Sequence, residues 1–233
     1  MRLALAGGEL ILLPEHAVLE PVTRSLLVAD LHLGKGLSFR ARGLNVPAGS
    51  TALTLERLTR LLDHHQPAAL LILGDLLHDA HARHPAVLER LSAWRHAYQG
   101  LEVSLLTGNH DRHAGALPES CGIRAAGAEL NLGAWTLRHD DGEGGRGFTI
   151  AGHVHPKVRI VAGIDAMVRP CFWLRERSLV IPAFGAMTGG WRVRPVGAER
   201  VFISTGAAVL DVTAAAQATS LRRRSSRSLN RTW

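Results

Sequence analysis

The sequence predicts an α/β fold, and three features of the chain support this prediction. Short runs of valine, isoleucine and leucine, bounded by glycine, proline or aspartate, are typical of buried β-strands. Two longer segments repeat apolar residues at helical spacing. Strands and helices alternate in the first half of the chain, which predicts a sheet with helices packed against it. After residue 130 the strands shorten and are joined by glycine and proline turns, so we expect a second sheet packed on the first.

The first-half elements follow these patterns in chain order. Residues 1–6 resemble a signal peptide only briefly, because Gly7, Gly8 and Glu9 interrupt the apolar run, and we expect a strand there. Further strands are expected at residues 10–13, 25–29, 68–73 and 101–106. The helices are expected at residues 50–64, with Leu53, Leu58, Leu61 and Leu62 on one face, and at residues 85–98, with Val87, Leu88, Leu91 and Trp94.

The second half of the sequence predicts further β-strands and a C-terminal tail. Strands are expected at residues 135–137, 148–151, 171–174, 179–181, 201–204 and 208–212. The chain has 233 residues, 46% of them hydrophobic, and no linker interrupts residues 1–212, so we expect one domain over residues 1–213. Residues 214–233 are expected to form a disordered, arginine-rich tail. The last 16 residues hold five arginines and no acid, so the rest carries only +2 of the net charge of +7.

The cysteine content and the hydropathy of the chain indicate the cellular compartment in which the protein works. The only cysteines, Cys121 and Cys171, are too few for a disulfide framework, and we expect them to be inert packing residues. No apolar run reaches the roughly 18 residues needed to span a bilayer. We therefore expect a cytoplasmic protein that does not bind membranes.

Polar side chains follow the predicted strands at the points where the strands end. Asp30-Leu31-His32, Gly74-Asp75, Gly108-Asn109-His110-Asp111 and Gly152-His153-Val154-His155 each follow a hydrophobic run, and His139 follows another. The carboxyl ends of strands in an open α/β sheet converge on one crevice. Carboxylate, imidazole and amide groups together suit Mn²⁺, Fe²⁺ or Zn²⁺, and one carboxylate can bridge two ions about 3.5 to 4 Å apart. The pattern predicts a two-metal site.

This ordered set of motifs resembles the calcineurin-like metallophosphoesterases. A narrower resemblance, over roughly residues 8–212, is to the bacterial ligase-associated DNA damage response phosphoesterases of the PdeM type. It rests on Asp30 to Lys35, on Phe39, Arg40, Gly43 and Pro47, on Gly152 to Pro156, and on Pro182 to Gly190. The resemblance implies a four-layer αββα sandwich of two mixed sheets flanked by helices. It also implies manganese-dependent phosphodiesterase or endonuclease activity in DNA repair, alongside a ligase and a helicase.

The resemblance also implies roles for individual residues. Asp30, His32 and His155 would hold one divalent ion, Asn109, His139 and His153 a second, and Asp75 would bridge them. His110 would be the catalytic histidine, and Asp111 would orient it by hydrogen bonding. The ions, most simply Mn²⁺ with Fe²⁺ or Zn²⁺ as alternatives, would activate a hydroxide for attack on the phosphate. Lys35 and Arg40 would contact substrate phosphate.

Several alternatives stay open at this point. The enzyme could instead cleave a cyclic nucleotide, a dinucleotide or a phosphomonoester, or the chain could be a silent scaffold. His113 is a rival to His139, and His78, His81 and His84 could form a separate metal site. Trp173 and Trp191 could stack on bases or belong to the core. The arginine-rich tail could add salt-dependent contacts to DNA or be functionally silent.

Overall fold

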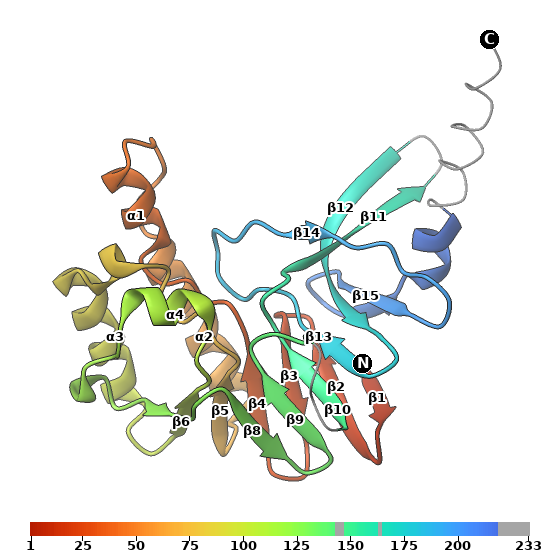
Figure 1. The fold of residues 1–233 in the computed structure, drawn as a ribbon, viewed down its shortest axis with the longest axis horizontal. Coiled ribbons are helices and arrows are strands. Elements are labelled where there is room, and N and C mark those ends of the chain that lie inside the picture. The colour runs from red at the N-terminus through yellow and green to blue at the C-terminus, as the bar shows by residue number, and fades with distance from the viewer. Residues whose placement is uncertain (143–146, 163–164, 219–233) are drawn as a thin grey trace.

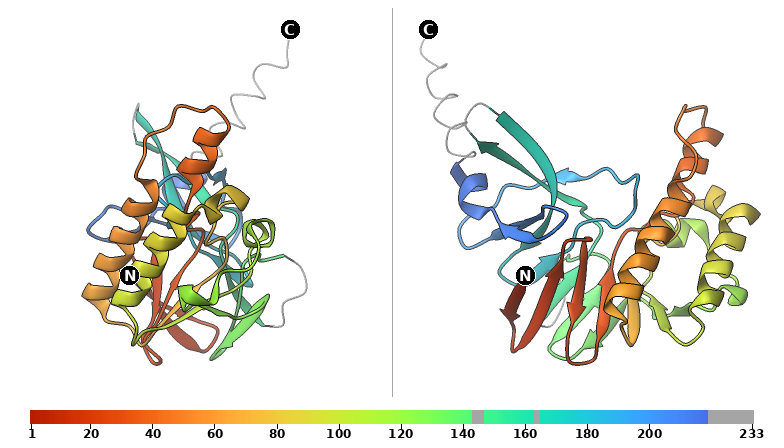
Figure 2. Two further views of the ribbon diagram at one scale, coloured as in Figure 1. Left: turned by 90° about the vertical axis from the view of Figure 1, so that its left-hand side faces the viewer. Right: turned by 180° about the vertical axis from the view of Figure 1, so that it is seen from behind.

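The computed structural model describes residues 1–142, 147–162 and 165–218, and its centre is a pair of face-to-face β-sheets (Figure 1, Figure 2). The first sheet has the strand order β1-β2-β3-β4-β5-β6-β7. Its strands are β1 (Arg2–Leu5), β2 (Gly8–Leu13), β3 (Ala17–Glu20), β4 (Ser25–Val28), β5 (Ala69–Ile72), β6 (Glu102–Leu105) and β7 (Arg124–Ala125). The first four strands form an antiparallel meander, and β4 to β7 run parallel. The sheet is therefore mixed, as expected.

The helices of the first half lie on one side of this sheet, and the first of them projects beyond its end (Figure 1). They are α1 (Lys35–Ala41), α2 (Ser50–His65), α3 (Pro85–Ala97) and α4 (Asn109–Ala114), with short 3₁₀ turns η1 (Ala80–Arg83) and η2 (Glu119–Cys121). The two predicted helices are thus confirmed as α2 and α3. Leu53 is 53% exposed, however, and Leu55 takes its expected place on the buried face of α2. Within the described residues no helix is long and apolar enough to cross a membrane.

The second sheet has the strand order β14-β11-β12-β13-β10-β9-β8, and β15 joins it by pairing with β12 and β16. Its strands are β8 (Glu129–Leu132), β9 (Trp135–Arg138), β10 (Phe148–Ala151), β11 (Pro156–Ala162), β12 (Asp165–Leu174), β13 (Ser178–Val180), β14 (Trp191–Arg192), β15 (Arg200–Ser204) and β16 (Val209–Asp211). The strands β9, β10 and β13 are parallel, and β11 and β12 form a long antiparallel hairpin. The predicted second sheet is confirmed.

Three buried clusters separate the layers of the sandwich. One lies between the helices and the first sheet, and a second lies between the two sheets. Successive residues of β15 then divide between two faces, since Phe202 packs between the sheets whereas Val201 and Ile203 pack in the third cluster. That third cluster includes Ala216, in the short helix at residues 213–218. The predicted αββα order is therefore present, and its fourth layer is only this short helix in the part of the chain that the structure describes.

The third cluster also bears on the expected tail. Ala216 is only 2% exposed, so packed structure continues a few residues past the boundary expected at residue 213. The five arginines of the expected tail lie outside the described residues. The disordered, arginine-rich tail therefore stays a prediction.

Candidate metal centre

The seven predicted ligands converge where parallel strands of both sheets end. Asp30 and His32 follow β4, Asp75 follows β5, and Asn109 follows β6. In the second sheet His139 follows β9, and His153 and His155 follow β10. Backbone hydrogen bonds tie these ends together: the amide of His32 donates to the carbonyl of Asp75 (2.9 Å), and that of Gly152 to the carbonyl of His139 (3.0 Å). The strand ends that bring the predicted ligands together therefore come from two sheets rather than one.

Asp30, His32 and His155 form one potential metal-binding group. The Nε2 atom of His155 lies 3.2 Å from Asp30 Oδ1 and 3.3 Å from His32 Nε2. Asp30 is fully buried; its Oδ2 accepts the amide of His153 (2.9 Å), but its Oδ1 accepts no hydrogen bond within the described structure. A buried carboxylate oxygen without a donor is costly, and a bound cation removes that cost. This group therefore fits a metal ion.

Asp75, His139 and His153 form a second potential metal-binding group, which Asn109 extends. The Nε2 atom of His139 lies 2.9 Å from Asn109 Oδ1, 3.1 Å from His153 Nδ1 and 3.4 Å from Asp75 Oδ2. Its Nδ1 atom is hydrogen-bonded to the carbonyl of Leu73 (2.8 Å), which fixes the ring. Ligand atoms bonded to one ion at about 2.0 to 2.2 Å lie roughly 3 Å apart, so the spacing around His139 Nε2 suits coordination.

The electrostatics of the centre favour a positive charge inside it. Burial lowers the pKa of His32 to about 2, so this imidazole is neutral near pH 7, which is the form that binds cations. Burial opposes ionisation of Asp75, but the hydrogen bond and charge of His139 hold its pKa at about 2. Burial likewise opposes protonation of His139, but Asp75 and Asp30 raise its pKa to about 9. In the absence of metal a protonated His139 imidazole thus offsets only part of the negative charge of the two carboxylates.

Five of the seven predicted ligands have a left-handed backbone. Their φ angles are 58° at Asp30, 46° at His32, 53° at Asp75, 65° at His153 and 49° at His155. Non-glycine residues rarely adopt this conformation, which costs of order 1–3 kcal/mol each. Strain concentrated at residues that share one crevice indicates a functional site.

Two glycines allow the strand ends to approach each other. A Cβ atom on Gly108 would lie 2.1 Å from Asp75 Oδ1, and one on Gly74, whose φ is +85°, would lie 2.4 Å from His139 Nδ1. Any larger residue would push a ligand out of place. The glycines that precede the ligands are thus required by close packing.

The structure corrects the role expected for Asp111. Its carboxylate accepts hydrogen bonds from the amides of Asp75 (2.7 Å), Gly108 (3.0 Å) and Leu77 (3.2 Å). His110 instead donates its Nδ1–H to the carbonyl of His78. The expectation that Asp111 orients the His110 ring is therefore wrong: Asp111 holds together the two loops that carry Asp75 and Gly108, and the backbone at residue 78 orients the ring.

His78 joins the centre, although the sequence indicated it only as part of a different cluster. His32, His78 and His110 form a third potential metal-binding group. His78 Nδ1 lies 3.3 Å from His32 Nδ1, and its ring stacks on His110 with centroids 4.8 Å apart. Burial also lowers the pKa of His78, to about 4. Its position depends on the path of the loop after Asp75, for which the sequence carries no local signal.

The other candidate histidines lie outside the centre. His81 faces Asp79 at the surface, and His84 caps α3 by accepting the amide of Ala86 (3.2 Å), so the two form no metal group with His78 among the described residues. His113 is exposed and donates to the carbonyl of Asn109 (2.7 Å). The geometry therefore favours His139 over His113 as a ligand.

The two expected phosphate contacts differ in position. Lys35 begins α1 and is half-buried; burial lowers its pKa, while the charges of Asp30 and Asp75 raise it. Its ammonium group is thus close enough to the centre to respond to both carboxylates. Arg40 is exposed and donates to the carbonyl of Pro47 (3.2 Å), and no contact with a predicted ligand is seen among the described residues.

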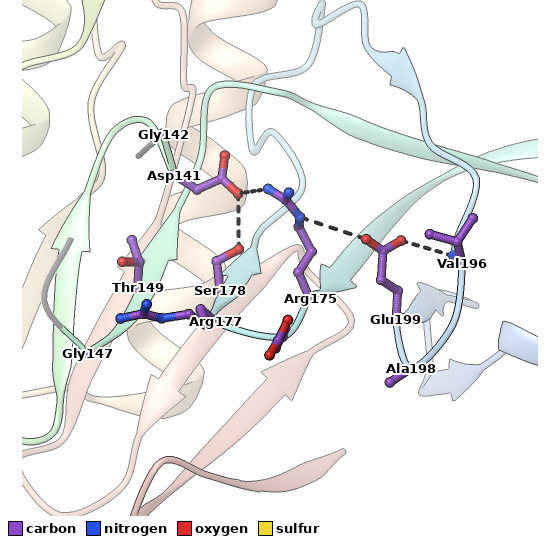
Figure 3. Close-up of a pocket in the computed structure, with 11 residues that line it drawn as sticks. Asp141, Gly142, Gly147, Thr149, Arg175, Arg177, Ser178, Val196, Ala198 and Glu199 are labelled. Carbon is purple, nitrogen blue, oxygen red and sulfur yellow. Dashed lines mark hydrogen bonds and ion pairs between the residues drawn. The ribbon is translucent and has the colours of Figure 1, made fainter. Parts of the chain in front are cut away.

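A separate hollow of about 630 Å³ holds none of the predicted ligands (Figure 3). In it Arg175 pairs with Asp141 and Glu199, and Asp141 also accepts the hydroxyl of Ser178 (3.0 Å). The guanidinium group of Arg175 also lies over the ring of Trp173, so that face of the ring is already covered and is not open to a base. Trp191 is 72% exposed and remains available for stacking, whereas Cys121 and Cys171 are buried, as expected.

Comparison with known proteins agrees with this geometry. The family model for calcineurin-like phosphoesterases matches residues 23–181. The crystal structure of the nuclease MPE from Pseudomonas putida is similar, with 38% sequence identity and a TM-score of 0.79 over 90% of this chain and 99% of that one. A search of curated proteins found no match.

Two further solved structures align weakly. The phosphoesterase Yfce from E. coli is 16% identical, with a TM-score of 0.40 over 80% of this chain and 96% of that one. An uncharacterised protein from Streptococcus pneumoniae, described as a predicted phosphoesterase, is 14% identical, with a TM-score of 0.31 over 76% and 80%. From the family match and the similarity to the nuclease, the chain belongs to the calcineurin-like phosphoesterase family and is a metal-dependent phosphoesterase.

Proposed function

We propose that this protein hydrolyses phosphodiester bonds in nucleic acid and uses two divalent metal ions. The observation that carries the proposal is the convergence of all seven donor residues on one crevice, in a chain that is 38% identical to a nuclease over nine-tenths of its length. A silent scaffold would have no need of a buried carboxylate oxygen without a donor, or of five strained ligands.

The donor set supports Mn²⁺, with Fe²⁺ or Zn²⁺ as alternatives. When bound, two such ions supply Lewis acidity for the phosphate and lower the pKa of a water molecule. Asp30, His32 and His155 would hold one ion, and Asn109, His139 and His153 the other. Asp75 lies between the two groups, with its Oδ2 atom 3.8 Å from His32 Nε2 and 3.4 Å from His139 Nε2, as a bridging carboxylate requires.

His110 is the residue that we propose to act on the leaving group. Its Nδ1–H donates to the carbonyl of His78, so the ring would give the leaving oxygen a proton from Nε2 when it is in the doubly protonated imidazolium form. A positioned acid of this kind contributes roughly 10²- to 10⁴-fold to a rate. Lys35, which responds to the charges of Asp30 and Asp75, would stabilise the negative charge of the phosphate.

A substrate panel tests the proposal. The Mn²⁺-loaded protein would be given single-stranded DNA, duplex DNA, RNA, bis-p-nitrophenyl phosphate and p-nitrophenyl phosphate. We expect cleavage of at least one nucleic acid and of the small diester. Hydrolysis of small esters without cleavage of any nucleic acid would refute the nucleic-acid substrate and favour a small-molecule phosphoesterase.

A role in DNA repair, together with a DNA ligase and a helicase, is also proposed. It is supported by the motif resemblance and would put the protein in the cytoplasm with the DNA. Deletion of the gene should then increase sensitivity to DNA-damaging agents, and unchanged sensitivity would count against the role.

A further inference from the structure

A small pocket of about 200 Å³ opens beside the metal centre. It shares His155 with that centre and is also lined by His16, Arg57, Lys157 and Thr188. Its volume is several times the roughly 30 Å³ that a water molecule occupies. No acidic residue lines the pocket among the described residues, although two side chains that are ordinarily cationic do.

Arg57 reaches the pocket from the middle of α2 and is fixed in place. Its guanidinium group donates to the carbonyls of Phe184 (2.7 Å) and Glu15 (3.2 Å) and lies 4.6 Å above the Phe184 ring. It forms no ion pair with any residue that the structure describes. A guanidinium group held by neutral carbonyls keeps its charge available for an anion, and its planar fork suits phosphate.

Lys157 supplies the second cation and connects the pocket to a longer row. It pairs in register with Arg192 of the parallel strand β14, so the two side chains leave the same face of the ribbon. Arg159 lies two residues further along β11 and shares that face. None of these three has an ion-pair partner in the described parts of the chain. The row runs along β11, whose far end projects with β12 as a hairpin from the body of the molecule (Figure 1).

The hollow shown in Figure 3 lacks this excess of positive charge. There Arg175 is paired with both Asp141 and Glu199. Its charge is therefore already neutralised, whereas Arg57, Lys157, Arg159 and Arg192 form no ion pair with any carboxylate in the described residues. A polyanion gains most by lying along the pocket and the ribbon.

We propose that this pocket binds a phosphate of the nucleic-acid chain next to the phosphate that is cleaved, and that Lys157, Arg192 and Arg159 guide the strand beyond it. The inference rests on the proposed function and adds where the substrate lies. A small ligand with a single phosphate would occupy only the pocket. A row of cations leading away from the pocket instead fits the repeated negative charges of a nucleic-acid strand.

The test compares a long substrate with a short one. Lys157→Gln and the double variant with Arg192→Gln would be assayed on an oligonucleotide that the wild type cleaves and on bis-p-nitrophenyl phosphate, which has only the scissile phosphate. We expect the KM for the oligonucleotide to rise about 3- to 10-fold per substitution, with the salt-dependence slope reduced by about 0.7 to 0.9 for each lost contact. The kcat/KM for the small diester should stay unchanged.

Arg169→Gln is the matched control. Arg169 is exposed and belongs to the same hairpin, but its register partner is Val158, which places it on the opposite face from Lys157. This variant should leave both substrates unaffected. Three outcomes would overturn the pocket proposal. The KM for the oligonucleotide could be unchanged in Lys157→Gln, this variant could lose activity equally on both substrates, or Arg169→Gln could have the same effect as Lys157→Gln. A wild type that neither cleaves nor binds oligonucleotides would overturn it together with the proposed function.

Discussion

The metal centre and the hollow of Figure 3 both contain aspartate side chains, but these differ in how they are paired. In the hollow, Asp141 is paired with Arg175 and also accepts the hydroxyl of Ser178. In the centre, Asp30 is more deeply buried, yet its Oδ1 atom accepts no hydrogen bond within the described structure. The hollow, with a volume of about 630 Å³, is thus a place whose charges are already satisfied. A buried carboxylate oxygen without a donor, placed among other metal-ligating side chains, distinguishes the centre from the hollow.

The largest expected effect comes from removing the carboxylate between the two metal groups. Asp75→Asn should lose metal and activity together, because the amide cannot balance two cations. The loss of activity should exceed the roughly 10- to 100-fold cost of deleting an outer partner of a metal ligand. Elemental analysis and turnover of the same preparation check this. Asp141→Asn, in the hollow, is the control and should keep its metal and its turnover.

His110→Ala should separate chemistry from metal binding. We expect turnover to fall by roughly 10²- to 10⁴-fold while both metal groups keep their ions, since His110 supplies a proton. Metal content and kcat would be measured on the same sample. Full turnover with metal bound would show that His110 has no catalytic role, and loss of metal would show that it is a ligand.

The pH dependence of metal binding is the next expected effect. His139 is protonated below a pKa of about 9 in the metal-free centre, so coordination must release this proton. Metal affinity should therefore fall about tenfold per pH unit as the pH drops from about 9 to 7.5. Calorimetry in buffers of different ionisation enthalpy would count the released protons. His139→Gln should remove the dependence, and an unchanged slope in that variant would refute the assignment.

Much of the fold could be predicted because the central strands are buried on both faces. The strands β4, β5 and β6 read as continuous apolar runs for that reason. The structure also contains β3 and the long hairpin of β11 and β12, most of which was not predicted. Residues 165–169 of this hairpin are exposed and hold only three consecutive apolar residues. The alternation of Lys157, Val158, Arg159 and Ile160 was a usable signal for β11.

The errors at the site and in α2 have geometric causes. Asp111 follows His110 directly in the first turn of α4, and adjacent helical residues do not face each other, so a bond between their side chains is not expected. Leu53 is five residues from Leu58, a spacing that takes it off the buried face, whereas Leu55 is three residues away. The positive φ angles of the ligands could not be predicted, because none of those residues is glycine.

The smallest expected effect compares the two carboxylates directly, in metal-free protein. Asp30→Asn should change the free energy of unfolding by less than about 1 kcal/mol, because the cost of burying an Oδ1 atom without a hydrogen-bond donor offsets the attraction between this carboxylate and protonated His139. Asp141→Asn should lower it by about 1 kcal/mol, since a half-exposed ion pair contributes modestly and the Ser178 hydroxyl loses a charged acceptor. Urea denaturation with a chelator present measures both. Adding Mn²⁺ should then stabilise the wild type and Asp141→Asn but not Asp30→Asn, because a ligand that binds only the folded state raises its stability. If Asp30→Asn instead destabilised the metal-free protein as much as Asp141→Asn, the unpartnered carboxylate would not be a cost that metal binding relieves, and the contrast between the two sites would fail.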